Sequence, residues 1–317
     1  NLKLMFSRDN NAYAAKSRYS ELFIGKKIIE VVDALVVCGW VNEKRGFNDR
    51  DTGSAFLTRI WPTTSLIAHF KTAKFHQFHV QNHEEREVII LRNEDKENVE
   101  YVDDDQDLDL AVMRTLLRDY NLLLDRTHID IETLEEPVIP LGEGKAKRFL
   151  PINQRSKFVN RIFNNSRWDH GGRFYGGWWQ TIPKEERRRI HFWNTPTSEI
   201  DYSALHIKLL YFRLNIDLEE DPYMIPSIEH NEMNRRIIKI ILLNITNAED
   251  PDGTDKLALK AIQGAINKNK ELRTYIKDNE LKWKLFLEPI KKHHSKIKKY
   301  FNTGVGIKLQ GFDSKIA

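Results

Sequence analysis

The sequence has little that would tie it to a membrane or to the outside of a cell. Its 317 residues include one cysteine, Cys38, which excludes a disulfide framework. No apolar run approaches the roughly 18 residues that a membrane span needs, and the first residues show no signal-peptide pattern. Cys38 lies in the apolar run VVDALVVCGW, so we expect it to be buried. The sequence therefore predicts a soluble, cytoplasmic protein without a membrane partner.

The chain also lacks a strong charge of one sign, since its formal net charge is only +4. The distribution of charge is more informative than the total. Between Arg155 and Arg189, basic residues outnumber acidic ones and aromatic residues are interleaved with them. Because phosphates attract Arg and Lys while bases stack on rings, this segment favours a nucleic-acid partner. A second basic run extends from Lys282 to Lys299, and for this run a solvated helix face is as good an explanation as a nucleic-acid partner.

One segment, EIDYSALHIKLLY, has the pattern of a strand that turns into a helix. Residues alternate in polarity up to Asp201, and apolar residues then follow at Leu205, Leu209 and Phe212 with helical spacing. Asp201 is expected at the junction, where a carboxylate can hold a metal ion. Aspartate is also a preferred helix N-cap, so a capping role fits the same position.

Several segments of the second half resemble, in order, the motifs of A-family DNA polymerases. The family places Thr-Gly-Arg-Leu and Gln-Asn-Ile-Pro segments before Asp-Tyr-Ser-x-x-Glu-x-Arg, then Arg-Arg-x-x-Lys, then Ile-Gln-Gly. The similar segments here are Gly171-Gly172-Arg173-Phe174, Gln180-Thr181-Ile182-Pro183, the run from Asp201 to Lys208, Arg235-Arg236-Ile237-Ile238-Lys239 and Leu309-Gln310-Gly311. The likeness covers about residues 160 to 317 and is nearest to compact polymerase-like proteins of bacterial mobile elements and phages.

The resemblance implies an α+β fold with a right-hand polymerase core behind an N-terminal accessory region. The expected parts are the accessory region at 1–150, a palm with the first catalytic motif at 151–218, helical fingers at 219–280, and a return to the palm at 281–317. Within the accessory region, patterns for a helix, two strands and a helix are compatible with a winged-helix-like element. They lie at Tyr19 to Val37, Trp40 to Trp61 and Pro62 to Phe75, and a strand pair at Glu87 to Arg92 and Asn98 to Val102 and a helix from Leu108 to Arg126 follow.

The implied activity is template-directed nucleotidyl transfer with two Mg²⁺ ions. By resemblance, Asp201 would hold metal with the backbone carbonyl of Tyr202 as a further ligand. Arg235 and Lys239 would face the nucleoside triphosphate. They lie four residues apart, so on a helix they share a face, although ordinary surface charge has the same spacing.

Other positions depart from the family or extend the likeness to DNA. His206 stands where the family has the glutamate that excludes the ribose 2′ hydroxyl, so we expect ribonucleotides to be accepted more readily. Where the family packs two aromatic residues beside the nascent base pair, this chain has Leu243 and Asn247. The residues expected to contact DNA are Arg173, Gln180, Arg188, Arg189 and Gln310.

The family's second metal-binding aspartate would lie a few dozen residues beyond Gln310, and we therefore expect the natural chain to extend further at both ends. The predicted partners are a primer–template or single-stranded DNA, nucleoside triphosphates and a small accessory protein. Two alternatives to DNA synthesis stay open. The first is priming or RNA synthesis by the same core, and the second is a DNA-binding protein without catalysis.

Overall fold

The protein consists of two compact units, Asn1–Glu87 and Val88–Ala317. The computed structural model describes residues 3–13, 17–20, 24–48, 55–74, 86–103, 110–142, 148–154, 156–250 and 252–316. The domain boundary expected near residue 150 lies inside the second unit.

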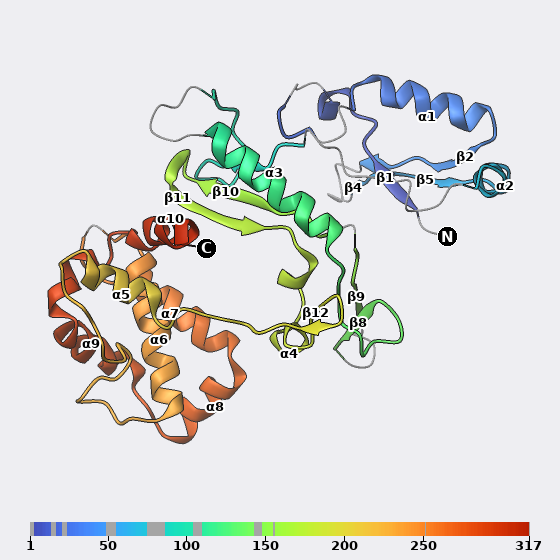
Figure 1. The fold of residues 1–317 in the computed structure, drawn as a ribbon. Coiled ribbons are helices and arrows are strands. Elements are labelled where there is room, and N and C mark those ends of the chain that lie inside the picture. Colours follow the sequence, from blue (N-terminus) through green and yellow to red (C-terminus); the bar gives the residue numbers. More distant parts are fainter. Residues whose placement is uncertain are drawn as a thin grey trace. The chain divides into compact units, whose positions relative to one another are not determined.

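The first unit contains the expected order of helix, strand pair and helix (Figure 1). Its central sheet has the order β1-β5-β2, with β5 antiparallel to both neighbours, and β3 and β4 form a second antiparallel pair. Thr63 caps α2 by accepting a hydrogen bond from the backbone N–H of Leu66. The elements are β1 Leu4–Phe6, η1 Asn10–Tyr13, α1 Lys27–Val37, β2 Val41–Lys44, β3 Phe47–Asn48, β4 Ala55–Phe56, β5 Thr58–Pro62 and α2 Thr64–Thr72.

Two expectations for this unit need correction. The first helix begins at Lys27 and not near Tyr19. Cys38 is exposed, not buried, because it is the C-cap of α1 and the only buried residue of that helix is Val32. The apolar run therefore continues past the part of the helix that packs on the sheet.

The first half of the second unit carries three small sheets and one long helix. The sheets have the orders β11-β10-β6, β13-β12-β7 and β8-β9. A core that includes Leu110, Leu117, Ile129 and Phe163 joins α3 to the strands. The elements are β6 Ile89–Leu91, α3 Leu110–Arg126, β7 Ile129–Asp130, β8 Val138–Leu141, β9 Arg148–Pro151, β10 Asn160–Asn164, β11 Arg167–Tyr175, η4 Trp178–Gln180, α4 Lys184–Arg187, β12 His191–Phe192 and β13 Thr195–Pro196.

The helix expected from Leu108 to Arg126 is confirmed as α3. Of the two strands expected before this helix, only the first is present. The first strand is β6, which pairs in parallel with β10. Asn98 makes an isolated bridge to Arg92 and begins no strand. The long-range pairing with β10 thus replaces the local hairpin that the sequence pattern predicts.

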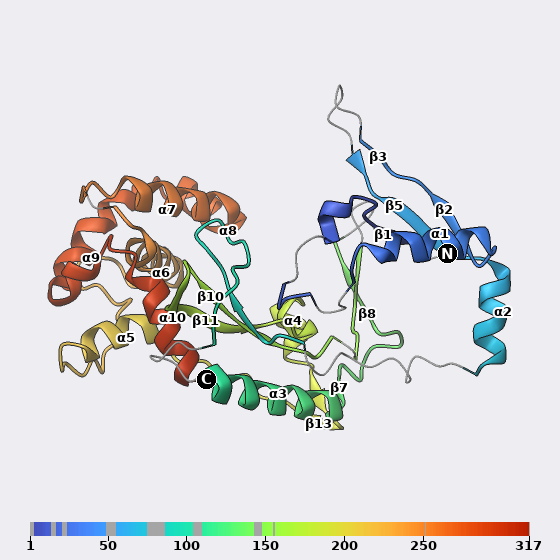
Figure 2. The same ribbon diagram turned by 90° about the horizontal axis from the view of Figure 1, so that it is seen from above.

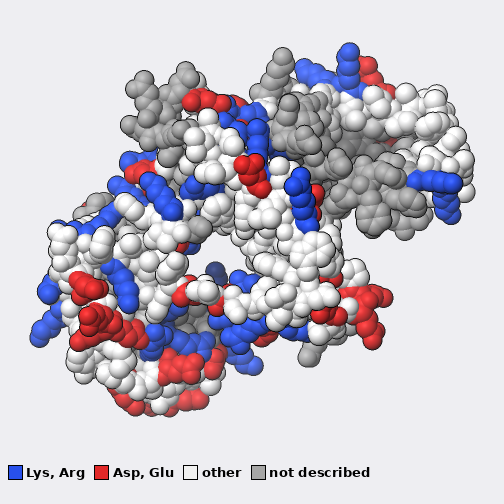
Figure 3. All heavy atoms as spheres, viewed as in Figure 1, with Lys and Arg blue, Asp and Glu red and all other residues white. Residues whose placement is uncertain are grey.

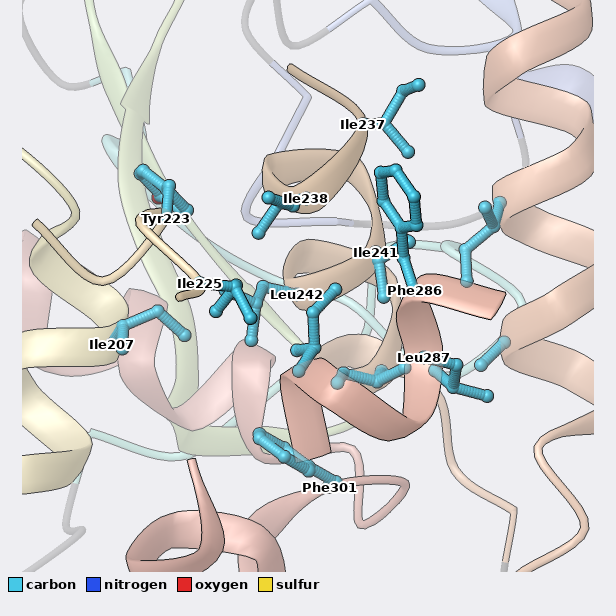
Figure 4. Packing of buried hydrophobic residues seen from close by; sticks show 14 of the residues in the cluster. Ile207, Tyr223, Ile225, Ile237, Ile238, Ile241, Leu242, Phe286, Leu287 and Phe301 are labelled. Carbon is cyan, nitrogen blue, oxygen red and sulfur yellow. The ribbon is translucent and has the colours of Figure 1, made fainter. Parts of the chain in front are cut away.

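The second half of this unit is helical, as predicted for residues 219–280. Its core is built on α6, whose buried face carries Ile237, Ile241 and Ile245. Phe286 and Leu287 belong to the same core cluster, as Figure 4 shows. Burying one such side chain contributes about 1.5–3 kcal/mol. The elements are α5 Leu205–Phe212, α6 Glu232–Asn247, α7 Lys256–Lys268, α8 Lys270–Asp278, η5 Trp283–Phe286, α9 Leu287–His293, η6 Ser295–Tyr300 and α10 Val305–Ile316.

Helix α10 joins the strands to the helices. It packs against β11, α5 and α6, and Figures 1 and 2 both show it beside the β10–β11 hairpin. A Cβ at Gly311 would stand 2.5 Å from the backbone oxygen of Asp169, so glycine permits the close approach of α10 to β11. Arg161 of β10 also bonds to α10, because its Nη2 donates to the hydroxyl of Ser314 at 3.0 Å. The protein is therefore an α+β protein with several small sheets.

A buried histidine makes the stability of this helical core depend on pH. His294 is fully buried; its Nδ1 accepts from the Tyr211 hydroxyl and its Nε2 donates to the carbonyl of Pro222, both at 2.9 Å. Burial lowers the pKa of His294 from 6.5 to about 4. Between these values the unfolded chain binds a proton that the folded chain does not, so stability is present above pH 6.5 and is lost as pH falls toward 4.

We expect the free energy of unfolding to fall by about 3 kcal/mol from this histidine alone when the pH is lowered from 6.5 to 4. His170 and His206 also have lowered pKa values and add to the slope. Urea unfolding across this range, compared between the wild type and His294→Gln, measures the contribution. Equal slopes in both proteins would show that His294 is not its source.

Candidate functional site

Asp201 lies in an exposed connection, not at the end of a strand. The preceding strand β13 ends at Pro196, and no residue from 197 to 204 is in a strand or helix. The prediction of a strand that leads to Asp201 is therefore wrong. Ile200 is 89% exposed and Tyr202 is 59% exposed, so neither residue is part of the hydrophobic core.

Asp201 is also not the N-cap of α5. That position is Ala204, which adopts a left-handed conformation with φ +53° and ψ +31° and provides no side-chain cap. The Asp201 carboxylate makes no hydrogen bond or ion pair with any residue that the structure describes. An exposed, unpaired carboxylate has the chemistry of a Mg²⁺ ligand, so Asp201 fits the metal that the resemblance implies. The described residues hold no group of three or more His, Cys, Asp or Glu side chains that could hold a metal ion.

A cluster of charged and aromatic groups lies beside Asp201. Arg235 donates from Nε to the Asp221 carboxylate at 2.8 Å, and its guanidinium lies 5.0 Å from the centre of the Tyr223 ring. The pKa of the Tyr223 hydroxyl is raised, mainly by burial; Arg235 opposes the rise, and the carboxylates of Asp221 and Asp201 add to it. Tyr223 therefore lies within electrostatic reach of both Asp201 and Arg235.

Asp221 is held ionised in this cluster. Burial by itself would raise the pKa of its carboxyl, but the hydrogen bonds from Arg235 and from the backbone N–H of Tyr223 lower it below the usual value. Arg235 is consequently not a free cation. Nη1 and Nη2 of Arg235 make no hydrogen bond with any described residue, so they can contact a phosphate while Nε stays bonded to Asp221.

Helix α6 carries four of the sequence-based candidates on one stripe. Arg235, Lys239, Leu243 and Asn247 recur every four residues within the helix Glu232–Asn247, so they share a face. The last three are exposed. Lys239 has no hydrogen-bond or ion-pair partner among the described residues, and its ammonium is available to an anion.

The C-terminal end of this stripe is close to α10. A Cβ at Gly306 would stand 1.8 Å from Oδ1 of Asn247. Asn247 donates to the carbonyl of Leu243 at 2.7 Å and thus closes the helix end. Leu243 remains 51% exposed beside it.

Arg173, His206 and Asp313 form a second cluster, with contributions from β11, α5 and α10. Nε and Nη2 of Arg173 both donate to Oδ2 of Asp313, at 2.9 and 2.5 Å. Nη2 also lies 3.3 Å from Nε2 of His206. Burial and the Arg173 charge lower the pKa of His206 while Asp313 opposes this, so the neutral imidazole accepts from Arg173. The side chain expected to select the sugar is thereby oriented by an arginine of a neighbouring element.

The remaining DNA-contact candidates differ in availability. Gln180 braces β11 by bonding the N–H of Gly176 and the carbonyl of Phe174, each at 3.0 Å. Arg189 pairs with Glu186 at 2.7 Å and bonds the hydroxyl of Thr133. Arg188 is exposed, and Gln310 is half-buried on α10.

The surface near α4 is basic. On the face seen in Figure 3, acidic and basic side chains are interspersed over the helices, and a group of basic ones lies beside the position of α4. Arg188 follows this helix as its C-cap. Arg173 and Arg189 form ion pairs, whereas Arg188 is exposed and has no ion-pair partner in the part of the chain that the structure describes.

Sequence reasoning missed Asp221, Tyr223 and Asp313. Asp313 could have been found, since it follows Gln310 by three residues and so lies on a neighbouring position of the same helix. Asp221 meets Arg235 across fourteen residues of irregular chain, and no local pattern predicts that contact.

None of the helices in the described part of the chain is long and apolar enough to cross a membrane. In comparisons with known proteins, no protein-family model, no curated protein and no solved structure matches this chain.

Proposed function

We propose that the chain is a template-directed nucleotidyltransferase, a DNA polymerase with a right-hand core similar to that of the A family. Its substrates are a primed or single-stranded DNA template and nucleoside triphosphates, and its role is replication of a mobile element or phage in the cytoplasm. A small accessory protein is part of the same proposal.

One observation carries this proposal. Helix α10, with Gln310, packs against the strand that holds Arg173, the helix that follows Asp201 and the helix that holds Lys239. Of the segments that resemble polymerase motifs, those with Arg173, His206 and Lys239 are far apart in the sequence and belong to elements that pack against α10. Chance likeness in unrelated segments gives no reason for them to share one neighbour.

The residues have separate roles in the proposed reaction. Asp201 would hold Mg²⁺, which neutralises charge on the reacting phosphates when it is bound. Lys239, which has no ion-pair partner among the described residues, would attract the triphosphate with its ammonium. Arg235 would add a second positive charge, and its ion pair with Asp221 fixes its position. His206 would lie against the sugar in an orientation set by Arg173.

Primer extension tests the proposal. The full chain is incubated with Mg²⁺, four deoxynucleoside triphosphates and a labelled primer on a template, and extension that stops at the template end is expected. Lys239→Ala should lower kcat/KM by roughly 10²-fold, about 2.7 kcal/mol, because a charge that stabilises the reacting phosphates is lost. Lys260→Ala, which removes an exposed lysine of α7, is the matched control and should extend normally.

Absence of extension by the wild type, or equal activity of Lys239→Ala and Lys260→Ala, would contradict the proposal.

A DNA-binding role without catalysis is the second candidate. It is favoured by one observation, that Asp221 and Asp313 are already engaged by Arg235 and Arg173. Priming with ribonucleotides is the variant of the first candidate that His206 favours.

A further inference from the structure

A cavity outside the proposed active site lies between α3 and the β10–β11 hairpin. Its volume is about 460 Å³, which is within the usual range for small-ligand sites. Three aromatic residues, Tyr120, Phe174 and Trp179, line it, and the polar groups are Arg161 and Gln180. None of the three rings belongs to the clusters around Asp201 or Arg173.

Arg161 contributes a cation that has no acidic partner among the described residues. Its Nε donates to the carbonyl of Gly172 at 2.8 Å, and its Nη2 donates to the carbonyl and hydroxyl of Ser314 at 3.3 and 3.0 Å. Nη1 makes no hydrogen bond with any residue in the described part of the chain. Burial lowers the pKa of this guanidinium, with no carboxylate to offset it. A half-buried cation of this kind is stabilised by a ligand that presents hydrogen-bond acceptors.

Two of the three rings lie close together, and one of them is partly open to solvent. Tyr120 is 45% exposed, and its ring centre lies 6.5 Å from that of Phe174 at an interplanar angle of 64°. The Arg161 guanidinium lies 5.4 Å from the centre of the Phe174 ring. Trp179 is held in place by Gly177, where a Cβ would stand 2.3 Å from the indole. The wall of the cavity is thus built by tight packing.

The neighbourhood favours nucleic acid as the source of this ligand. Phe174 directly follows Arg173 on β11, so one strand contributes to both the proposed active site and the cavity. Aromatic rings beside Arg side chains are the arrangement with which proteins bind single strands, because every base can stack and carries acceptors for a guanidinium.

We propose that this cavity binds an unpaired base of single-stranded nucleic acid, which stacks on Tyr120 and accepts a hydrogen bond from Arg161. The inference rests on the proposed function and names a binding subsite for its template strand. It assigns Tyr120 a role in affinity and none in the chemical step.

The test compares two labelled probes, a twelve-residue oligothymidylate and an abasic strand with the same number of phosphates. Binding is measured by fluorescence anisotropy with the full chain. The wild type should bind the base-bearing strand more tightly. Tyr120→Ala should weaken that binding about tenfold, within the range of about 1–3 kcal/mol per stacked base, and leave the affinity for the abasic strand unchanged. Tyr120→Phe should retain wild-type affinity.

Tyr175→Ala is the matched control, since Tyr175 is 43% exposed on the same hairpin but does not line the cavity. Equal affinity of wild type and Tyr120→Ala for oligothymidylate would overturn the inference, as would equal losses on both probes. If Tyr120→Ala binds normally while the wild type extends primers, only the subsite is wrong. If neither probe binds and no primer is extended, both proposals fail.

Discussion

Replacing Asp201 with asparagine is expected to reduce primer extension by roughly 10³-fold or more, which corresponds to about 4 kcal/mol of transition-state stabilisation. The substitution keeps the size of the side chain and removes the negative charge that would hold Mg²⁺. Asp201 is exposed and unpaired among the described residues, so the fold should not change. Single-turnover extension measures the chemical step, and anisotropy measures DNA affinity, which should stay within about twofold because the proposed phosphate contacts would come from other residues.

Asp217→Asn is the matched control, because Asp217 is likewise exposed in the connection that follows α5. This variant should extend primers at the wild-type rate. An Asp201→Asn protein that does the same would remove Asp201 from the reaction. Loss of activity together with loss of DNA binding would point to a folding or binding defect in place of a missing metal ligand.

Replacing Lys291 with alanine should destabilise the helical part of the second unit by about 3–5 kcal/mol. Lys291 of α9 pairs with Asp255 at the start of α7, and both residues are only 8% exposed. Without the ammonium, the Asp255 carboxylate stays buried with Asn302 as its remaining donor, at 2.5 Å. Urea unfolding followed by circular dichroism measures the loss.

Lys292→Ala, which removes the exposed neighbouring lysine, should change stability by less than about 0.5 kcal/mol. The double variant Lys291→Met with Asp255→Asn should recover most of the loss, because it leaves no buried charge and asparagine tolerates the left-handed backbone at position 255, where φ is +56°. The idea is refuted if Lys291→Ala and Lys292→Ala unfold at the same urea concentration.

The helices were predictable where an apolar stripe and a capping residue agree. Helix α6 is the clearest case, since Asn231 caps it by accepting from the N–H of Asn234 at 2.8 Å, and its buried isoleucines recur with helical spacing. Lys239 on the opposite face could therefore be placed from the sequence alone. The segment before Asp201 has an equally regular alternation, but nothing packs against it, so no strand forms.

The candidate site was predictable only in part, because its charged groups meet across long separations. The Arg173–Asp313 contact spans 140 residues, and it exists because α10 lies across β11. The sequence pattern predicts each element by itself. It carries no information on which carboxylate neutralises which arginine.

By itself the sequence determined helix α3, the helical character of residues 219–280, the face of α6 that carries Lys239, and the likeness that suggests nucleotidyl transfer, since these depend on residues a few positions apart. Only the tertiary structure decided that Asp221 holds Arg235, that Asp313 and Arg173 orient His206, and that none of the described carboxylates pairs with Arg161. Such pairings depend on which elements pack together, and that is settled by the burial of apolar faces over the whole unit.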